Sequence, residues 1–222
     1  MLLRESSAPY TRRVSRIAIF GGSGKLGSKL LTRALDHDHR VNVLTRDPAA
    51  IKRHAENLTL IKGDAETGEG VAATVRGCRW IICSLASTKP VIAQCLSHIV
   101  RELQASRIAE RIIFVSRIGV GDSKDQGRKV SGLLQPYMPV VKRPLFDDLA
   151  EAEELLRISG LATLILRATL LTDDETSRPV VTASPTDAPP HRIGRTALAN
   201  TMLELLEAPT WSPGELTVGS AK

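Results

Sequence analysis

The sequence predicts an α/β fold built on one doubly wound parallel sheet with helices on both faces. Short apolar runs rich in β-branched residues recur about every 20 to 35 residues, and a longer segment with helical apolar spacing follows each run. Nearly continuous apolar runs suit strands buried on both faces, and their alternation with helices favours parallel pairing. A glycine-rich turn separates the first run from the first helical segment. With 222 residues and no Pro/Gly/Ser-rich linker, the chain is expected to form a single domain.

Six apolar runs predict the strands of the sheet. They span residues 16–20, 40–45, 58–62, 80–84, 111–116 and 162–166. Between them, apolar side chains recur at helical spacing and form the stripes expected of buried helix faces. Two of these stripes consist of Leu26, Leu30, Leu31 and Ala34, and of Val91, Cys95, Ile99 and Leu103.

The two ends of the chain depart from this pattern. Residues 1–15 carry arginines and no apolar signal-peptide core, so we expect a flexible basic arm before a domain that spans residues 16–222. Near the other end, residues 178–183 and 215–218 predict short strands, and residues 193–207 predict an amphipathic helix. Late elements of this kind cover the substrate side of such a sheet, so a small C-terminal substrate-side region is expected.

Composition argues against several classes of function. The net charge is +6, but the basic residues are scattered and only two Tyr and three Phe are available for base stacking, so no nucleic-acid partner is expected. No apolar run approaches the roughly 18 residues that a membrane span needs, so no membrane partner is expected. Cys78, Cys83 and Cys95 lack the close paired spacing of a zinc site. They predict reduced core thiols, no metal and a cytoplasmic location.

The glycine turn points to a dinucleotide. Gly21, Gly24 and Gly27 follow an apolar run and open a helical segment, which is the context that a Rossmann-type fold requires. Glycine lets backbone N–H groups approach phosphate oxygens, and the positive end of the helix dipole faces them. Gly22 adds freedom to the turn, and Lys25 either adds positive charge near the phosphates or faces solvent.

The end of the second predicted strand bears on the choice of cofactor. NAD-binding folds carry an Asp or Glu there, about 20 residues after the glycines, whereas this chain has Thr45 and Arg46. A 2′-phosphate would pair with the Arg46 guanidinium and accept a hydrogen bond from Thr45, so NADP(H) is preferred over NAD(H). The alternative is that Arg46 is a solvated residue at a strand end. Asp47 is expected to cap the helix that starts at Pro48 in either case.

The ends of the third and fourth predicted strands offer further cofactor contacts. Asp64 either accepts the hydrogen bond of the adenine amino group or caps the helix that follows. The small residues of the stretch 84–87 would let the backbone approach the second half of the dinucleotide.

Together, these features resemble one family. The glycine turn, Thr45-Arg46, Gly63-Asp64, Phe114-Val115-Ser116 and Ser159-Gly160-Leu161 are similar to the atypical short-chain dehydrogenases of the NmrA-like type, over roughly residues 16–208. Within that family the chain most resembles the biliverdin-IXβ reductases, which are also flavin reductases. The resemblance implies a monomer or weak homodimer that binds NADPH and reduces a planar conjugated acceptor such as a flavin, quinone or tetrapyrrole.

The resemblance also implies roles for individual residues. Gly21, Ser23, Gly24 and Leu26 would line the pyrophosphate, Arg46 the 2′-phosphate, Asp64 with Ala65 the adenine, and Leu85 with Ala86 the nicotinamide ribose. Ser116 would stand beside the nicotinamide ring, with Arg167 and Thr169 at the end of the next strand. Thr169 stands where the biliverdin-IXβ reductases place a His, and Thr supplies no titrating proton near neutral pH. The loop 117–122 also lacks aromatic residues to stack on a flat substrate. Biliverdin reduction is therefore less favoured than the general class.

The predicted chemistry needs little from the protein. Tyr137 and Lys142 do not form the Tyr-x-x-x-Lys pair of ordinary short-chain dehydrogenases, because their spacing is wrong and prolines interrupt the segment. Ser116 and Arg117 are the catalytic candidates: Ser116 would hydrogen-bond the nicotinamide amide or a substrate carbonyl, and Arg117 or Arg167 would stabilise developing negative charge. The alternative is that Ser116 satisfies local backbone groups and Arg117 is solvated.

Asp147 and Asp148 are interpreted as N-terminal caps of a helix that follows them.

Two functions follow from these features. The first is an NADPH-dependent reductase of a small planar acceptor. The alternative is a non-enzymatic NADP(H) sensor or assembly factor, which the missing Tyr-Lys pair, the missing His and the aromatic-poor loop would suit.

Overall fold

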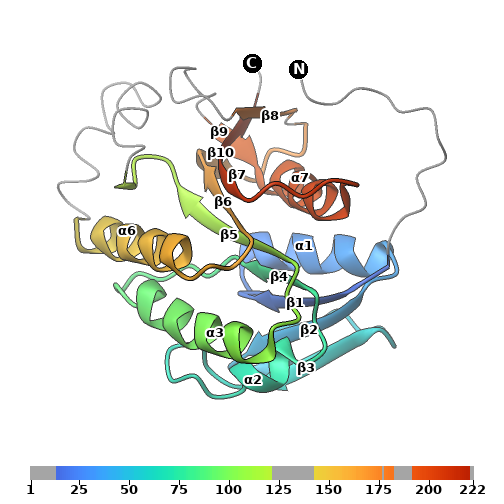
Figure 1. The fold of residues 1–222 in the computed structure, drawn as a ribbon. Helices are drawn as coiled ribbons and strands as arrows, with labels where there is room; N and C mark the ends of the chain where they lie inside the picture. The colour runs from blue at the N-terminus through green and yellow to red at the C-terminus, as the bar shows by residue number, and fades with distance from the viewer. Residues whose placement is uncertain (1–13, 122–142, 177, 183–191, 221–222) are drawn as a thin grey trace.

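The computed structural model describes residues 14–121, 143–176, 178–182 and 192–220 (Figure 1). Its central sheet has eight strands in the order β3-β2-β1-β4-β5-β6-β10-β8. All neighbours pair in parallel except β10 and β8, which pair antiparallel at one edge. The strands are β1 (Arg16–Phe20), β2 (Arg40–Thr45), β3 (Leu58–Lys62), β4 (Trp80–Cys83), β5 (Arg111–Arg117), β6 (Thr163–Ala168), β8 (Pro179–Thr182) and β10 (Gly214–Ser220).

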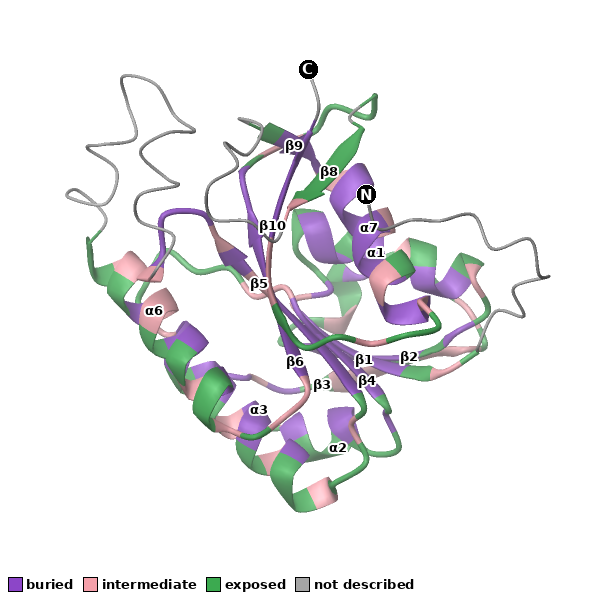
Figure 2. Cartoon of the chain, turned by 45° about the horizontal axis from the view of Figure 1, so that its top comes forward, coloured by how far each residue is buried: buried purple, intermediate pink, exposed green. Residues whose placement is uncertain are grey.

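Helices cover both faces of the sheet (Figure 1). They are α1 (Lys25–Asp36), α2 (Val71–Val75), α3 (Ile92–Ser106), α6 (Arg143–Ile158) and α7 (Arg195–Glu207), with a 3-10 turn η1 (Pro48–Ala50) after β2. Helices α1 and α7 pack on one face, and α2, α3 and α6 pack on the other. Alternate residues of β1 therefore enter different cores: Ile17 and Ile19 face α1 and α7, whereas Ala18 and Phe20 face the other layer. Figure 2 shows the strands buried throughout the middle of the sheet.

The doubly wound parallel fold that the sequence predicts is confirmed, and the six early strands begin within one residue of their predicted starts. Strand β4 ends one residue earlier than predicted, and β5 and β6 run one and two residues further. The sequence analysis misses β7 (Leu170–Thr172) and β9 (Arg192–Gly194), which form a separate parallel pair. Three residues are too few for an apolar period, so only their pairing defines these strands.

Helix α6 corrects one prediction. It begins at Arg143, so Asp147 and Asp148 lie inside the helix and do not cap it. Asp148 caps a different helix: its carboxylate accepts the backbone N–H groups of Ile92 and Ala93, at 2.8 and 3.1 Å, in the first turn of α3. The bond ties α3 to α6 across more than fifty residues of sequence. Asp47 does accept the N–H of Ala49 at 3.0 Å, as predicted, although η1 is a single 3-10 turn.

Two glycines allow the close approach of α1 to the strands. Gly21 has a φ of +90°, and a Cβ there would lie 2.6 Å from the carbonyl oxygen of Ser84. A Cβ at Gly27 would lie 2.0 Å from the carbonyl oxygen of Gly21. Both positions therefore exclude a side chain, which places the start of α1 directly against the turn after β1.

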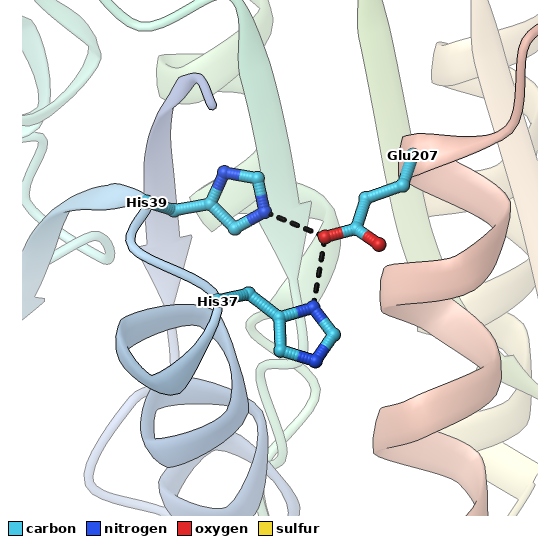
Figure 3. Close-up of side chains that lie close together, drawn as sticks. All are labelled: His37, His39 and Glu207. Atoms are coloured by element: carbon cyan, nitrogen blue, oxygen red, sulfur yellow. Dashed lines mark hydrogen bonds and ion pairs between the residues drawn. The ribbon is translucent and has the colours of Figure 1, made fainter. Parts of the chain in front are cut away.

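A polar cluster of His37, His39 and Glu207 fastens α7 near the end of the sheet at which the parallel strands begin. Figure 3 shows its three side chains. Glu207 Oε1 lies 2.8 Å from His37 Nδ1 and 2.9 Å from His39 Nε2. The Nδ1 atom of His39 accepts the backbone N–H of Ser15 at 3.1 Å, so its Nε2 must carry the proton that is donated to Glu207. A histidine that binds a metal instead donates its second ring N–H. The cluster is therefore a structural clamp between α1, β2 and α7.

The expected basic arm lies almost wholly in residues 1–13, outside the described residues, and so does the segment with Tyr137 and Lys142. None of the helices in the described part of the chain combines the length and apolar character that crossing a membrane requires.

Candidate active site

A cavity of about 990 Å³ opens at the edge of the sheet where the parallel strands end. Its walls come from the start of α1, the segments after β4 and β6, the end of β5, and the first turns of α6. The strand order reverses between β1 and β4, and in open α/β sheets ligands bind at such a point. The lining residues on which the argument depends are Lys25, Leu85, Ser116, Arg117, Phe146 and Thr169.

The glycine turn forms one end of the cavity. Gly24, Lys25 and Leu26 line it, and the N–H of Gly24 is bound to the carbonyl of Gly21 at 3.0 Å. The first N–H groups of α1 have no partners within the helix, and no acidic residue lies in its first turn. This end therefore presents N–H groups, the helix dipole and the Lys25 ammonium to an anion.

Arg46 and Thr45 lie at the end of β2, beside the glycine turn, because Leu44 pairs with Phe20 across the two strands. The Thr45 hydroxyl is buried and serves the local turn, donating to the carbonyl of Asp47 at 2.9 Å and accepting its N–H at 3.3 Å. The Arg46 side chain is exposed, and no carboxylate in the described part of the chain pairs with it. Its guanidinium is thus open to a ligand on this edge.

Asp64 serves the turn that follows β3. Its Oδ1 accepts the N–H of Glu66 at 3.0 Å, and its backbone bridges Glu69. Of the two roles that the sequence allows for Asp64, the helix cap is wrong, because α2 begins only at Val71 and Asp64 stabilises a turn. Ala65 is buried next to it.

Ser116 lies at the cavity wall with a buried ionic network behind it. Its Oγ donates to Glu153 Oε1 at 2.5 Å. Arg167 binds the same carboxylate with Nη2 at 2.7 Å and Nε at 3.2 Å, and contacts Glu215 with Nη1 at 2.7 Å. Burial is the largest single influence on the pKa of Arg167 and lowers it, but the hydrogen bond to Glu153 and the negative charges of Glu153 and Glu215 together leave the pKa of the guanidinium raised. The structure thus places Arg167 behind Ser116 and away from the cavity lining.

Arg117 and Phe146 form the polar and aromatic part of the cavity wall. The Arg117 guanidinium carbon lies 5.9 Å from the centre of the Phe146 ring, within the range of a cation–π contact. Burial lowers the pKa of Arg117. The loop after Ser116 lacks aromatic residues, as the sequence shows, but α6 brings an aromatic ring to the same place. The expectation of an aromatic-poor site therefore holds for the loop and not for the cavity.

Thr169 has a hydroxyl without a partner. The residue is 3% exposed, lines the cavity, and its Oγ1 makes no hydrogen bond with any described residue. A buried polar atom of this kind costs free energy of roughly 1–3 kcal/mol unless a partner arrives. The buried hydroxyl of Thr163, at the other end of β6, also lacks a partner among the described residues, but of these two threonines Thr169 alone lines the cavity.

Sequence reasoning missed Phe146, Leu149 and Glu153. All three lie on α6, whose start the sequence analysis places too late. One signal was present: Glu153 falls on the apolar stripe that includes Ala152 and Leu156, and a carboxylate on a buried helix face needs partners inside the protein.

Fold and site together define a dinucleotide-binding domain with an open ligand cavity beside the glycine turn. Residues 21–209 match a family model described as NAD(P)H-binding, so the chain belongs to that family.

Solved structures with the same fold share little sequence with the chain. A short-chain dehydrogenase/reductase from Veillonella parvula in complex with NADP has a TM-score of 0.76 at 20% identity, covering 94% of this chain and 95% of that one. ChuY, an anaerobillin reductase from Escherichia coli O157:H7, has a TM-score of 0.79 at 22% identity, covering 94% and 98%. Identities this low show a shared fold alone.

Curated relatives match over a short segment. A 3 beta-hydroxysteroid dehydrogenase/Delta 5-->4-isomerase from Mycobacterium tuberculosis is 34% identical over 77 residues, or 35% of this chain. The chain spans about a fifth of the length of that relative.

Proposed function

We propose that this protein is an NADPH-dependent reductase that transfers hydride to a planar conjugated acceptor: a flavin, quinone or tetrapyrrole. The observation that carries the proposal is the cavity itself, which joins an anion-binding helix start to a wall made of Phe146, Leu145 and Leu149. NAD(P)H supplies a hydride when bound. The anaerobillin reductase among the structures of the same fold adds support for a tetrapyrrole-like acceptor.

The residues of this chain fit the cofactor part by part. The N–H groups at the start of α1 and Lys25 would hold the pyrophosphate, and Arg46 would bind the 2′-phosphate. Leu85 and Ala86 would lie along the nicotinamide ribose. The unpartnered hydroxyl of Thr169 would gain a polar partner from the nicotinamide end.

The remaining wall suits a flat acceptor. Phe146 and the leucines of α6 offer an apolar surface against which a conjugated ring system can stack. Arg117 lies at the same wall and would stabilise negative charge that develops on the acceptor. The cavity is open to solvent, so water can deliver the proton that accompanies the hydride.

The first experiment measures oxidation of NADPH, through the loss of its reduced-nicotinamide absorbance, with a panel of flavins, quinones and biliverdin. We expect turnover with at least one of these acceptors. Binding of NADPH without turnover on the whole panel would contradict the reductase and leave the cofactor sensor as the better explanation.

A matched pair of variants tests the cofactor preference. Arg46→Ala removes a charge-assisted contact worth about 1.5–3 kcal/mol, so NADPH affinity should fall about tenfold or more while NADH affinity changes little. Arg40→Ala alters another exposed arginine, at the start of β2 and away from the glycine turn, and should change neither affinity. Equal losses for both cofactors in the Arg46 variant would place the 2′-phosphate elsewhere.

A further inference from the structure

We infer that Glu153 fixes the direction of the Ser116 hydrogen bond, so that Ser116 meets the cavity as an acceptor and binds the carboxamide NH₂ of the nicotinamide. Glu153 is a positioning residue in this arrangement, because it acts through Ser116 and does not line the cavity. The inference rests on the proposed function and specifies one contact within it.

The hydroxyl of Ser116 has one proton, and that proton is directed away from the cavity. Ser116 Oγ donates it to Glu153 Oε1 at 2.5 Å, a short bond of the kind made to a charged acceptor. Guanidinium groups only donate, so the contacts from Arg167 and Arg157 require both Glu153 oxygens to accept. What remains for a ligand is the pair of acceptor sites on Ser116 Oγ.

The carboxylate is held so that this direction cannot reverse. Arg167 binds both of its oxygens, and Arg157 Nη2 lies 3.2 Å from Oε2. Both arginines are fixed in turn by Glu215, at 2.7 Å in each case. Glu153 is fully buried, and a Cβ at Gly121 would lie 3.3 Å from Oε2, so the backbone after β5 covers the carboxylate closely.

This arrangement changes the chemistry available to Ser116. A serine that shares its proton with a neighbouring carboxylate is a poor proton donor to a substrate carbonyl, because the alkoxide left behind would lie beside a negative charge. An N–H donor is its natural partner. The nicotinamide carboxamide offers one at the place where the site would hold the ring, and anchoring that group would fix which face of the ring meets the acceptor.

The test compares NADP⁺ with its 3-acetylpyridine analogue, in which a methyl group replaces the carboxamide NH₂. The dissociation constants of the wild type for both are measured by calorimetry. One hydrogen bond is worth about 1 kcal/mol, so NADP⁺ should bind about fivefold more tightly than the analogue. In Ser116→Ala this ratio should fall to near one, because NADP⁺ loses affinity and the analogue does not.

Glu153→Gln tests the positioning role. Its amide oxygen should turn toward the guanidinium groups and its NH₂ toward Ser116, which would direct the Ser116 proton into the cavity. Both ligands offer a carbonyl to that proton, so the ratio should again approach one. Glu207→Gln is the matched control. This buried carboxylate also accepts two side-chain hydrogen bonds, from His37 and His39 (Figure 3), but it does not line the cavity. Its ratio should stay at the wild-type value.

The outcomes separate the inference from the proposed function. A wild-type ratio near one, or a ratio that Ser116→Ala leaves unchanged, overturns the inference while NADPH binding and turnover still stand. If the Glu153→Gln variant folds and keeps the wild-type ratio of dissociation constants, Glu153 does not position Ser116. A purely structural role for Glu153 would weaken both ligands equally, as loss of fold would. Absence of NADP⁺ binding to the wild type overturns both proposals.

Discussion

Replacing Gly27 with alanine should destabilise the protein, although helix propensity alone predicts the reverse. Gly27 lies in the first turns of α1, where alanine is intrinsically favoured by about 1 kcal/mol. Its Cβ would lie 2.0 Å from the carbonyl oxygen of Gly21, 2.7 Å from the carbonyl carbon and 2.9 Å from Gly22 Cα. All three are backbone atoms that no rotamer change can remove. Ordinary contact begins at 3.4 Å, so α1 would have to retreat by about 1.4 Å.

The clash should exceed the gain in propensity. Forcing extra volume into a packed site costs about 3 kcal/mol at the upper end of its usual range, which leaves a net loss of about 2 kcal/mol after the helix term. For a domain of this size the melting temperature should fall by about 4–8 °C. NADPH affinity should fall as well, because the retreat moves the N–H groups at the start of α1.

Thermal unfolding followed by circular dichroism, with NADPH titration at a temperature where the variant is folded, measures both effects. Gly24→Ala is the stability control. A Cβ there meets only the Gly21 carbonyl oxygen, at 3.2 Å, and alanine is a poorer helix cap than glycine by less than about 1 kcal/mol, so this variant should lose less stability than Gly27→Ala. A Gly27→Ala variant that melts at or above the wild-type temperature would refute the close packing of α1 on the turn.

Two further predictions concern buried groups. Asp148→Ala removes the carboxylate that accepts two N–H groups at the start of α3, so the free energy of unfolding in urea should fall by about 2 kcal/mol. Asp147→Ala alters an exposed neighbour and should cost less than about 0.5 kcal/mol. Equal losses in the two variants would contradict the capping role of Asp148. Burial, with nearby carboxylates, raises the pKa of the Cys95 thiol from 9.0 to about 11. The unfolded chain therefore releases this proton first, so stability should fall as pH rises from 9 toward 11. Cys95→Ala should flatten that slope, and an unchanged slope would contradict the assignment.

The early strands could be predicted because burial on both faces imposes a composition that the sequence displays directly. Residues 17–20 and 80–83 have no room for polar side chains, since each neighbours a strand on either side and a helix layer above and below. The glycine turn could be predicted for the same reason, because Gly21 and Gly27 stand where no other residue fits. Steric and solvation constraints of this strength act on single positions, so one sequence reveals them.

The wall of the cavity could not be predicted in the same way. Phe146 and Glu153 owe their roles to the placement of α6, which depends on the packing of the whole helix and not on any local pattern. The helix start was misjudged because Asp147 and Asp148 look like caps, whereas Pro144 near the true start is the signal that Pro in a first turn provides. Arg167 shows the same limit: its place near the end of the sixth strand could be predicted, but its pairing with Glu153 could not.

Buried polar groups with and without hydrogen-bond partners lie at both ends of the parallel strands, and the cavity distinguishes one end from the other. At the edge where the strands begin, His37, His39 and Glu207 form a hydrogen-bonded set that fixes α7 (Figure 3). At the end where they finish, several donors bind the Glu153 carboxylate behind Ser116, whereas the Thr169 hydroxyl has no partner in the described part of the chain. The hydroxyl of Thr163, at the start of β6, also lacks a partner among the described residues, so a missing hydrogen bond does not by itself mark a binding site. Thr169 differs from Thr163 because it lines the cavity. The position of Thr169 at the end of β6, beside the cavity that begins at the glycine turn, makes the nicotinamide half of the cofactor the best candidate.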